Sequence, residues 1–349
     1  MRSTLGPNRP TILGHWRPGP LGRFSAWGAC GAPSQNPSAH ARAHAPAHPA
    51  HIPVPTRTPL RPALSPSTVG RSAGARRRPG VRDTGRPARA WPHRLSAAER
   101  VLLSSYDQTI LSDDPVLFLG LGGAGTEVSP GGLIATYHGS PAHTHLPNGD
   151  TATLFDGTSG QYVEVPDSDV LSVSTTGALT IEAWFRPDVL VFPRPEGSGY
   201  VHWLGKLTYA TVNQCEWVAR VYSADNTEGR ANRVSGYAFN PPGGLGAGSY
   251  FQDPLRPGEW IHYALVITTA PDGPAEPPGH TKLYRDGRLR DRDALADYNI
   301  VPGNTTSPLR IGSATLRSYF LGGIGKVAVY PRELSAERLA AHHAAMTAC

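Results

Sequence analysis

Residues 179–186, which read Leu-Thr-Ile-Glu-Ala-Trp-Phe-Arg, alternate in character along the chain. The odd positions are all apolar, while the even ones include a carboxylate, an indole and a guanidinium. Because successive side chains of a β-strand point to opposite faces, the pattern predicts a strand with one buried face. The buried face should carry Leu179, Ile181, Ala183 and Phe185, and the opposite face Glu182, Trp184 and Arg186.

Short runs rich in Val, Ile, Tyr, Phe and Trp continue this pattern on both sides of that stretch. Turn signals such as Asp156-Gly157, Pro257-Gly258 and Asp286-Gly287 separate them. Strands without intervening helices are typical of an antiparallel sandwich or barrel. The predicted strands are Thr153–Phe155, Tyr162–Val165, Ala178–Arg186, Tyr200–Lys206, Glu216–Tyr222, Arg233–Asn240, Trp260–Thr268, Lys282–Arg285, Leu309–Gly312 and Tyr319–Tyr330.

Composition divides the 349-residue chain near residue 95. Residues 1–95 hold 15 Arg, no Lys and a single acid, Asp83, which gives a charge of +14, together with 16 Pro and 10 Gly. Residues 96–349 hold 33 − 15 = 18 basic and 27 − 1 = 26 acidic groups, a net charge of −8. We therefore expect a disordered leader over residues 1–95 and one ordered domain over residues 96–349.

The leader contains two weaker signals. The cluster Arg76-Arg77-Arg78 is a candidate nucleic-acid contact, but no aromatic residues alternate with the arginines to stack on bases, so we expect no nucleic-acid partner. Four histidines between residues 40 and 51 have helical spacing, but Pro46 and Pro49 interrupt any helix. The leader lacks the apolar stretch of a secretory signal, and no run reaches the ~18 apolar residues of a membrane span.

A short helix is expected at each end of the domain. Ser96-Ala97-Ala98-Glu99 has the form of a capping box, and the helical pattern continues to Leu111. Near the C-terminus Ser335 is a good N-cap, and Leu334 before it can pack on Leu339 in a helix that runs to about Met346. The sparse apolar positions of this second helix suggest that it lies across a sheet edge.

Alternation also predicts where a ligand would bind. Four predicted strands, which we expect to share one face, carry aromatic and planar polar side chains on it, the types that recognise the apolar faces and hydroxyl groups of sugars. In the alternative interpretation, the arginines and glutamates pair across the sheet and the tryptophan packs beneath a loop. The candidate ligand-binding residues are Trp184, Arg186, His202, Glu216, Arg220, Tyr222, Arg233 and Tyr237.

Eight segments follow one another along the domain: Asp114–Leu121, Ala152–Gly157, Tyr162–Pro166, Leu179–Pro187, Gly258–Val266, Leu283–Gly287, Leu309–Gly312 and Gly322–Tyr330. In this order they resemble laminin-G-like domains of the concanavalin A-like lectin/glucanase superfamily over roughly residues 110–345. The resemblance implies an all-β, two-sheet antiparallel jelly-roll sandwich with a concave face, and an extracellular or cell-surface location. Related domains bind saccharides or protein partners on that face or its rim, sometimes with calcium.

Catalysis is not expected. Glucanases of this superfamily carry carboxylates at alternate positions of one strand, and retaining hydrolysis needs two carboxyl groups about 5 Å apart. Here the strands carry isolated acids, while Asp291 and Asp293 lie in an arginine-rich stretch that we interpret as a solvated turn. We therefore expect a non-catalytic module that binds carbohydrate or a protein surface. A structural part of a larger assembly, such as a phage tail or cell surface, is the alternative, and a glycoside hydrolase is less favoured.

Calcium is the one cofactor candidate. Calcium requires several oxygen ligands that converge from loops. Four aspartates near turns offer such oxygens, although Asp-Gly is first of all a turn signal. They are Asp156, Asp167, Asp169 and Asp253.

Overall fold

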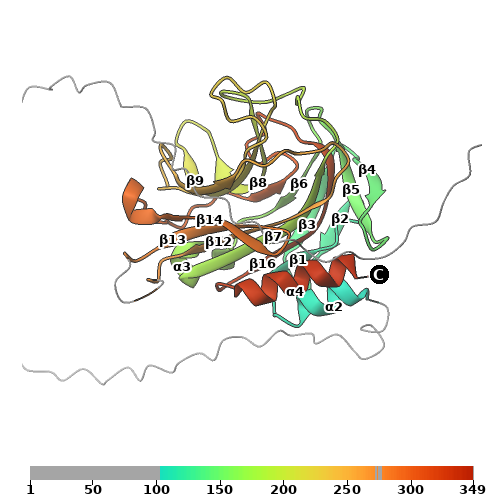
Figure 1. Cartoon of the computed structure of the whole chain (residues 1–349), viewed down its shortest axis with the longest axis horizontal. Helices are drawn as coiled ribbons and strands as arrows, with labels where there is room; N and C mark the ends of the chain where they lie inside the picture. Colours follow the sequence, from blue (N-terminus) through green and yellow to red (C-terminus); the bar gives the residue numbers. More distant parts are fainter. Residues whose placement is uncertain (1–102, 272, 274–276, 349) are drawn as a thin grey trace, which may run out of the picture. The chain divides into compact units, whose positions relative to one another are not determined.

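Two antiparallel β-sheets form a sandwich (Figure 1), which confirms the predicted fold class. The computed structural model describes residues 103–271, 273 and 277–348, so the predicted leader and its boundary at residue 95 lie outside the described part. The first sheet has the order β14 (Arg288–Ala294), β13 (His280–Arg285), β12 (Ile261–Thr268), β7 (Ala178–Pro187), β16 (Leu321–Tyr330), β5 (Thr151–Asp156) and β4 (Ala142–His145), with β1 (Leu117–Leu119) beside β16. The second has the order β11 (Ala247–Phe251), β10 (Val234–Ala238), β9 (Gln214–Tyr222), β8 (Tyr200–Thr208), β15 (Leu309–Ile311), β6 (Tyr162–Val165), β3 (Ile134–His138) and β2 (Thr126–Val128).

The main core fills the space between the sheets. The odd positions of 179–186 are buried there together with residues of both sheets, as alternation predicted. Phe185 of β7 stacks on Trp203 of β8 with 4.7 Å between ring centroids, and Tyr263 of β12 meets Trp203 edge-on at 5.1 Å. Complete burial of such a side chain contributes about 1.5–3 kcal/mol, so these rings anchor one sheet on the other.

One predicted turn is a strand. Residues 288–294 form β14, which pairs with β13 at the edge of the first sheet. Its carboxylates accept hydrogen bonds from backbone N–H groups of edge strand β11. Asp291 Oδ2 accepts from Tyr250 N (2.9 Å), and Asp293 Oδ2 accepts from Gly248 N (3.1 Å). Charged residues on an edge strand prevent further pairing, so the charge of this segment marks an edge and not a turn. The strands β2, β3, β4 and β11 were also not predicted.

Helices α2 (Ser105–Leu111) and α4 (Ala336–Thr347) lie side by side on the outer surface of the first sheet (Figure 1). The predicted cap of α4 is confirmed, since Ser335 Oγ accepts from Arg338 N at 3.3 Å. The helix lies on the sheet face instead of its edge. The predicted capping box at Ser96–Glu99 lies outside the described residues; α2 begins at Ser105, is capped by Ser104 and ends at the predicted Leu111. The short elements are η1 (Asp169–Leu171), α3 (Val173–Thr176) and η2 (Leu295–Tyr298).

Candidate functional site

Strands β8, β9 and β10 place polar and aromatic side chains together on the outer surface of the second sheet. In the strand register His202 lies opposite Arg220, and Arg220 lies opposite Ser235. The inward neighbours of these residues belong to the main core, so the cluster faces away from it. We call this cluster the Arg220 face; it consists of Glu196, Tyr200, His202, Arg220, Tyr222, Arg233, Tyr237 and Tyr250.

His202 orients Arg220. Arg220 Nε donates to His202 Nε2 at 2.5 Å, and His202 Nδ1 donates to the carboxylate of Glu196. Since Nε2 accepts a hydrogen bond, the imidazole is neutral. Burial, and then the charge of Arg220, lower the pKa of His202 to about 4. Burial alone would raise the pKa of Glu196, but its hydrogen bonds from His202, Thr315 and Ser318 hold that pKa at about 2.

Tyrosine rings flank the arginines of this face. The Arg220 guanidinium lies 4.7 Å from the ring centroids of both Tyr200 and Tyr237, and the Arg233 guanidinium lies 3.8 Å from that of Tyr250. Tyr200, Arg220 and Tyr237 are half-buried, whereas Tyr250 is exposed. Cation–π contacts of this kind contribute about 0.5–2 kcal/mol each. They therefore hold positive charge at a surface that a ligand can reach.

Tyr222 supplies an acceptor oxygen within the cluster. Its Oη lies 3.3 Å from Tyr237 Oη, and Arg230 Nη1 donates to it at 3.4 Å. Burial alone would raise the pKa of Tyr222, but the nearby Arg220 charge and the hydrogen bond with Tyr237 lower it below its ordinary value. Burial and the neighbouring Tyr222 oxygen raise the pKa of Tyr237 to about 12. Tyr222 Oη thus accepts from Arg230 and shares a hydrogen bond with Tyr237 Oη.

Two of the predicted site residues lie elsewhere. Strand β7 belongs to the first sheet, so the expectation that four neighbouring strands share one face is wrong for this strand. Trp184 is buried beneath α2 and α4, where it stacks on His262 at 5.2 Å and on His343 at 5.6 Å between ring centroids. Arg186 pairs with Asp188 at 2.8 Å. The strand that follows these residues, β8, belongs to the second sheet and carries the first of the remaining predicted residues, His202.

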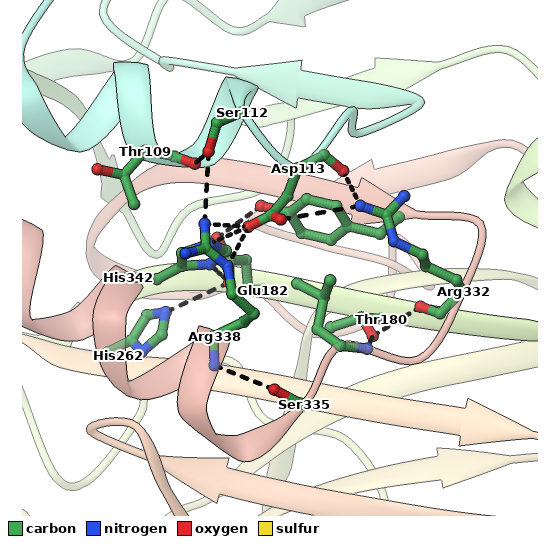
Figure 2. A network of polar contacts seen from close by, with 12 residues as sticks. Thr109, Ser112, Asp113, Thr180, Glu182, His262, Arg332, Ser335, Arg338 and His342 are labelled. Carbon is green, nitrogen blue, oxygen red and sulfur yellow. Dashed lines mark hydrogen bonds and ion pairs between the residues drawn. The ribbon is translucent and has the colours of Figure 1, made fainter.

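The polar residues next to Trp184 hold the helices in place. Figure 2 shows His342 of α4 between Glu182 of β7 and Asp113, with Arg338 also directed at Asp113. Tyr330 of β16 donates to Glu182 Oε1 at 3.1 Å. Glu182 and His342 are fully buried. This network joins helices to sheet and offers little surface to a ligand.

Glu216 also leaves the proposed face. The register of β8 and β9 shifts after Lys206, which lies opposite Trp217, and Glu216 is the extra residue of the resulting bulge. Its Oε1 accepts from Lys206 Nζ at 2.5 Å and from Thr305 N at 2.8 Å. A strict period of two cannot foresee this shift. The carboxylate therefore holds a connecting segment and does not join the Arg220 face.

The structure thus brings together five of the eight predicted residues, namely His202, Arg220, Tyr222, Arg233 and Tyr237. Three residues of the face were missed. Tyr200 has the same parity as His202 along β8, so alternation could have found it. Tyr250 lies in the unpredicted strand β11, and Glu196 lies before β8 in a segment to which no period applies.

The four candidate calcium ligands do not converge. The described residues contain no group of three or more His, Cys, Asp or Glu side chains that could hold a metal ion. Each candidate instead has partners that explain its position. These are Thr158 and Gln161 for Asp156, Lys206 for Asp167, Asn304 for Asp169, and Arg285 and Arg290 for Asp253.

A separate shallow pocket of about 410 Å³ lies between residues 212–214, Pro241–Pro242 and residues 304–306. Its polar groups already bond to one another. Asn213 Nδ2 donates to Pro242 O at 3.3 Å, and Thr306 Oγ1 donates to Gln214 Oε1 at 2.8 Å. The pocket therefore offers fewer free polar groups than the Arg220 face.

Comparison with protein families identifies the chain. A laminin G family model, described as the concanavalin A-like lectin/glucanases superfamily, matches residues 156–340. The match spans more than half of the chain, so the protein belongs to this family. No curated protein matches the chain. None of the helices in the described residues is long and apolar enough to cross a membrane.

Solved structures agree with this fold. The binding domain of botulinum neurotoxin DC in complex with SialylT matches 68% of this chain and 52% of its own, with 12% identity and a TM-score of 0.50. The serotype C1 binding domain gives 13% identity, 68% and 53% coverage and a TM-score of 0.48. The type G receptor binding domain has 11% identity, and the match covers 66% of this chain and 50% of that domain with a TM-score of 0.45. The chain thus spans about half of these structures, and the likeness concerns the fold alone.

Proposed function

We propose that the domain is a non-catalytic recognition module that binds a saccharide on the Arg220 face. The observation that carries this proposal is the half-buried group of Tyr200, Arg220 and Tyr237 on a sheet face, supplemented by the exposed Tyr250. On the first sheet, by contrast, α2 and α4 cover the equivalent outer surface around Trp184.

The chemistry of the face suits a sugar. Aromatic rings pack on the apolar C–H faces of a pyranose, while guanidinium and phenol groups hydrogen-bond to its hydroxyl groups. The Glu196–His202 pair fixes Arg220 before any ligand arrives, which reduces the entropy lost on binding. Binding domains among the structures of similar fold, one of them solved with SialylT, support the proposal without identifying a ligand.

A glycan array probed with the full chain tests the proposal. Binding to a defined set of glycans that weakens in Tyr237→Ala is the expected result. The matched control is Tyr162→Ala, since Tyr162 lies in β6 of the same sheet and stacks on His138 at 4.2 Å. If no glycan binds at millimolar concentration while the chain assembles into oligomers, the domain serves as a structural component and the proposal is wrong.

A further inference from the structure

Positive charge on the Arg220 face lacks the carboxylate partners that the rest of the domain provides. Among the described residues, the other half-buried or buried lysines and arginines each form an ion pair with a carboxylate. Arg220 and Arg233, on neighbouring strands, form none. The paired cations are Arg186, Lys206, Arg230, Lys282, Arg285, Arg310, Lys326 and Arg338.

This exception is notable because carboxylates are abundant. Residues 96–349 carry 26 acidic and 18 basic groups, so an acidic partner for Arg220 would be easy to supply. The nearest acid in the hydrogen-bonded chain, Glu196, is separated from Arg220 by the neutral ring of His202. Arg220 Nε is used in the contact with His202, and no nitrogen of its guanidinium forms an ion pair with a carboxylate.

The polar groups around Arg220 show the same surplus of donors. Arg233 donates to Gln252 through Nη2, but its buried Nε–H has no acceptor. A buried donor without an acceptor costs about 1–3 kcal/mol. A ligand with negative charge and oxygen acceptors would compensate the positive charge of Arg220 and Arg233.

We infer that the ligand of the Arg220 face is an acidic saccharide, whose carboxylate pairs with the Arg220 guanidinium. This inference rests on the proposed function and narrows its substrate class. A guanidinium presents paired N–H groups that match a carboxylate in a two-point hydrogen bond. The tyrosines on both sides of Arg220 favour a sugar ring over an acidic peptide. Their aromatic rings and hydroxyl groups can contact a sugar, whereas an extended peptide would need backbone hydrogen-bond partners.

Matched acidic and neutral sugars test the inference by titration calorimetry with the full chain. The pairs are trigalacturonic acid with its methyl ester, and 3′-sialyllactose with lactose. We expect at least one acid to bind about tenfold or more tightly than its neutral partner, in line with a charge-assisted pair. Arg220→Gln should remove this preference. Arg285→Gln should preserve it, since Arg285 also lies near a ring, that of Phe251, but pairs with Asp253.

Three outcomes would overturn the inference, and they are distinguishable. Equal binding of acid and neutral partner would contradict the role of charge and leave the proposed function standing. An acid preference that survives in Arg220→Gln, with an unchanged melting temperature, would place the carboxylate elsewhere. Binding of a hexaglutamate peptide by a chain that binds none of the sugars would replace the saccharide with an acidic protein segment, and would also contradict the proposed function.

Discussion

His342 Nδ1 lies 2.9 Å from Glu182 Oε2, and His342 Nε2 lies 2.8 Å from Asp113 Oδ2. One imidazole thus joins α4 to β7 and to the segment that follows α2 (Figure 2). Because both ring nitrogens face carboxylates, the ring is protonated. Burial alone would lower the pKa of His342, but the two carboxylates raise it above its ordinary value. The C-terminal helix is therefore held by a buried, charged contact.

Glu182→Gln should destabilise the domain by about 3 kcal/mol, because the buried charge of His342 then keeps only one of its two carboxylate partners, Asp113. Urea unfolding of the full chain measures this difference. Glu164→Gln is the control, since Glu164 pairs with Arg310 in a partly exposed ion pair and should cost less than about 1 kcal/mol. Equal costs for the two variants would show that the Glu182 contact contributes no more than a surface pair.

The stabilisation from His342 should depend on pH in a defined direction. Its pKa is raised on folding, so its contribution is complete below the ordinary value of 6.5 and is lost as pH rises through the higher folded value. Burial would raise the pKa of Glu182, but His342 and His262 lower it to about 2, so the Glu182 contribution is present above pH 4.5. The cost of His342→Gln should therefore be largest between pH 4.5 and 6.5. Urea midpoints of both proteins across pH 4–9 test this, and a cost that grows above pH 7 would contradict it.

Alternation along the strands predicted most of the architecture. The odd positions of 179–186 formed the core as expected, because the sheet buries one face of this strand against the other sheet. The even positions of the same strand, Trp184 and Arg186, were wrongly assigned to the binding face. A period of two separates the faces of a strand, but it does not say which sheet the strand joins, nor that α4 will cover Trp184.

The remaining misses have local causes. The bulge at Glu216 arises from the pairing of β9 with β8, and it moves the Glu216 side chain off the expected face. The sequence pattern of one strand carries no information about such a shift in pairing. Residues 288–294 looked like a turn because they are charged, yet their charge protects a sheet edge. Arg220 and His202 were predicted on one face, but their contact with Glu196 depends on a long-range approach of the segment before β8.

Tyr250→Ala should weaken ligand binding while leaving the fold intact. Tyr250 is 41% exposed, and its ring lies 3.8 Å from the Arg233 guanidinium. The ring is exposed, and a cation–π contact at such a site contributes about 0.5–1 kcal/mol, so the free energy of unfolding should fall by no more than about 1 kcal/mol. Loss of a ring that contacts sugar should weaken binding about three- to tenfold. The measurements are calorimetry with the best glycan of the array and urea unfolding; unchanged affinity would place Tyr250 outside the binding surface.

Gly248→Ala should alter the Arg220 face indirectly, by displacing the ring of Tyr237. A β-carbon at Gly248 would lie 2.1 Å from Cδ1 of Tyr237, so the tyrosine ring would have to leave its present position beside Arg220. We expect glycan affinity to fall and the unfolding midpoint to decrease modestly. Gly123→Ala is the control, because the nearest atom to its β-carbon would be 3.8 Å away, and it should change neither quantity. Unchanged glycan affinity in Gly248→Ala would show that the position of Tyr237 does not matter for binding.

His202 should titrate in the direction opposite to His342. Burial and the Arg220 charge lower its folded pKa to about 4, whereas the unfolded chain takes up a proton near the ordinary value of 6.5. The stability contributed by the neutral ring is therefore complete above pH 6.5 and is lost as pH falls from 6.5 to 4. Histidine resonances of the ¹⁵N-labelled full chain, assigned with His202→Asn, measure both values. A His202 resonance that titrates near pH 6.5 would mean that the ring does not accept a hydrogen bond from Arg220. The conclusion that His202 fixes the orientation of the Arg220 guanidinium would then be wrong.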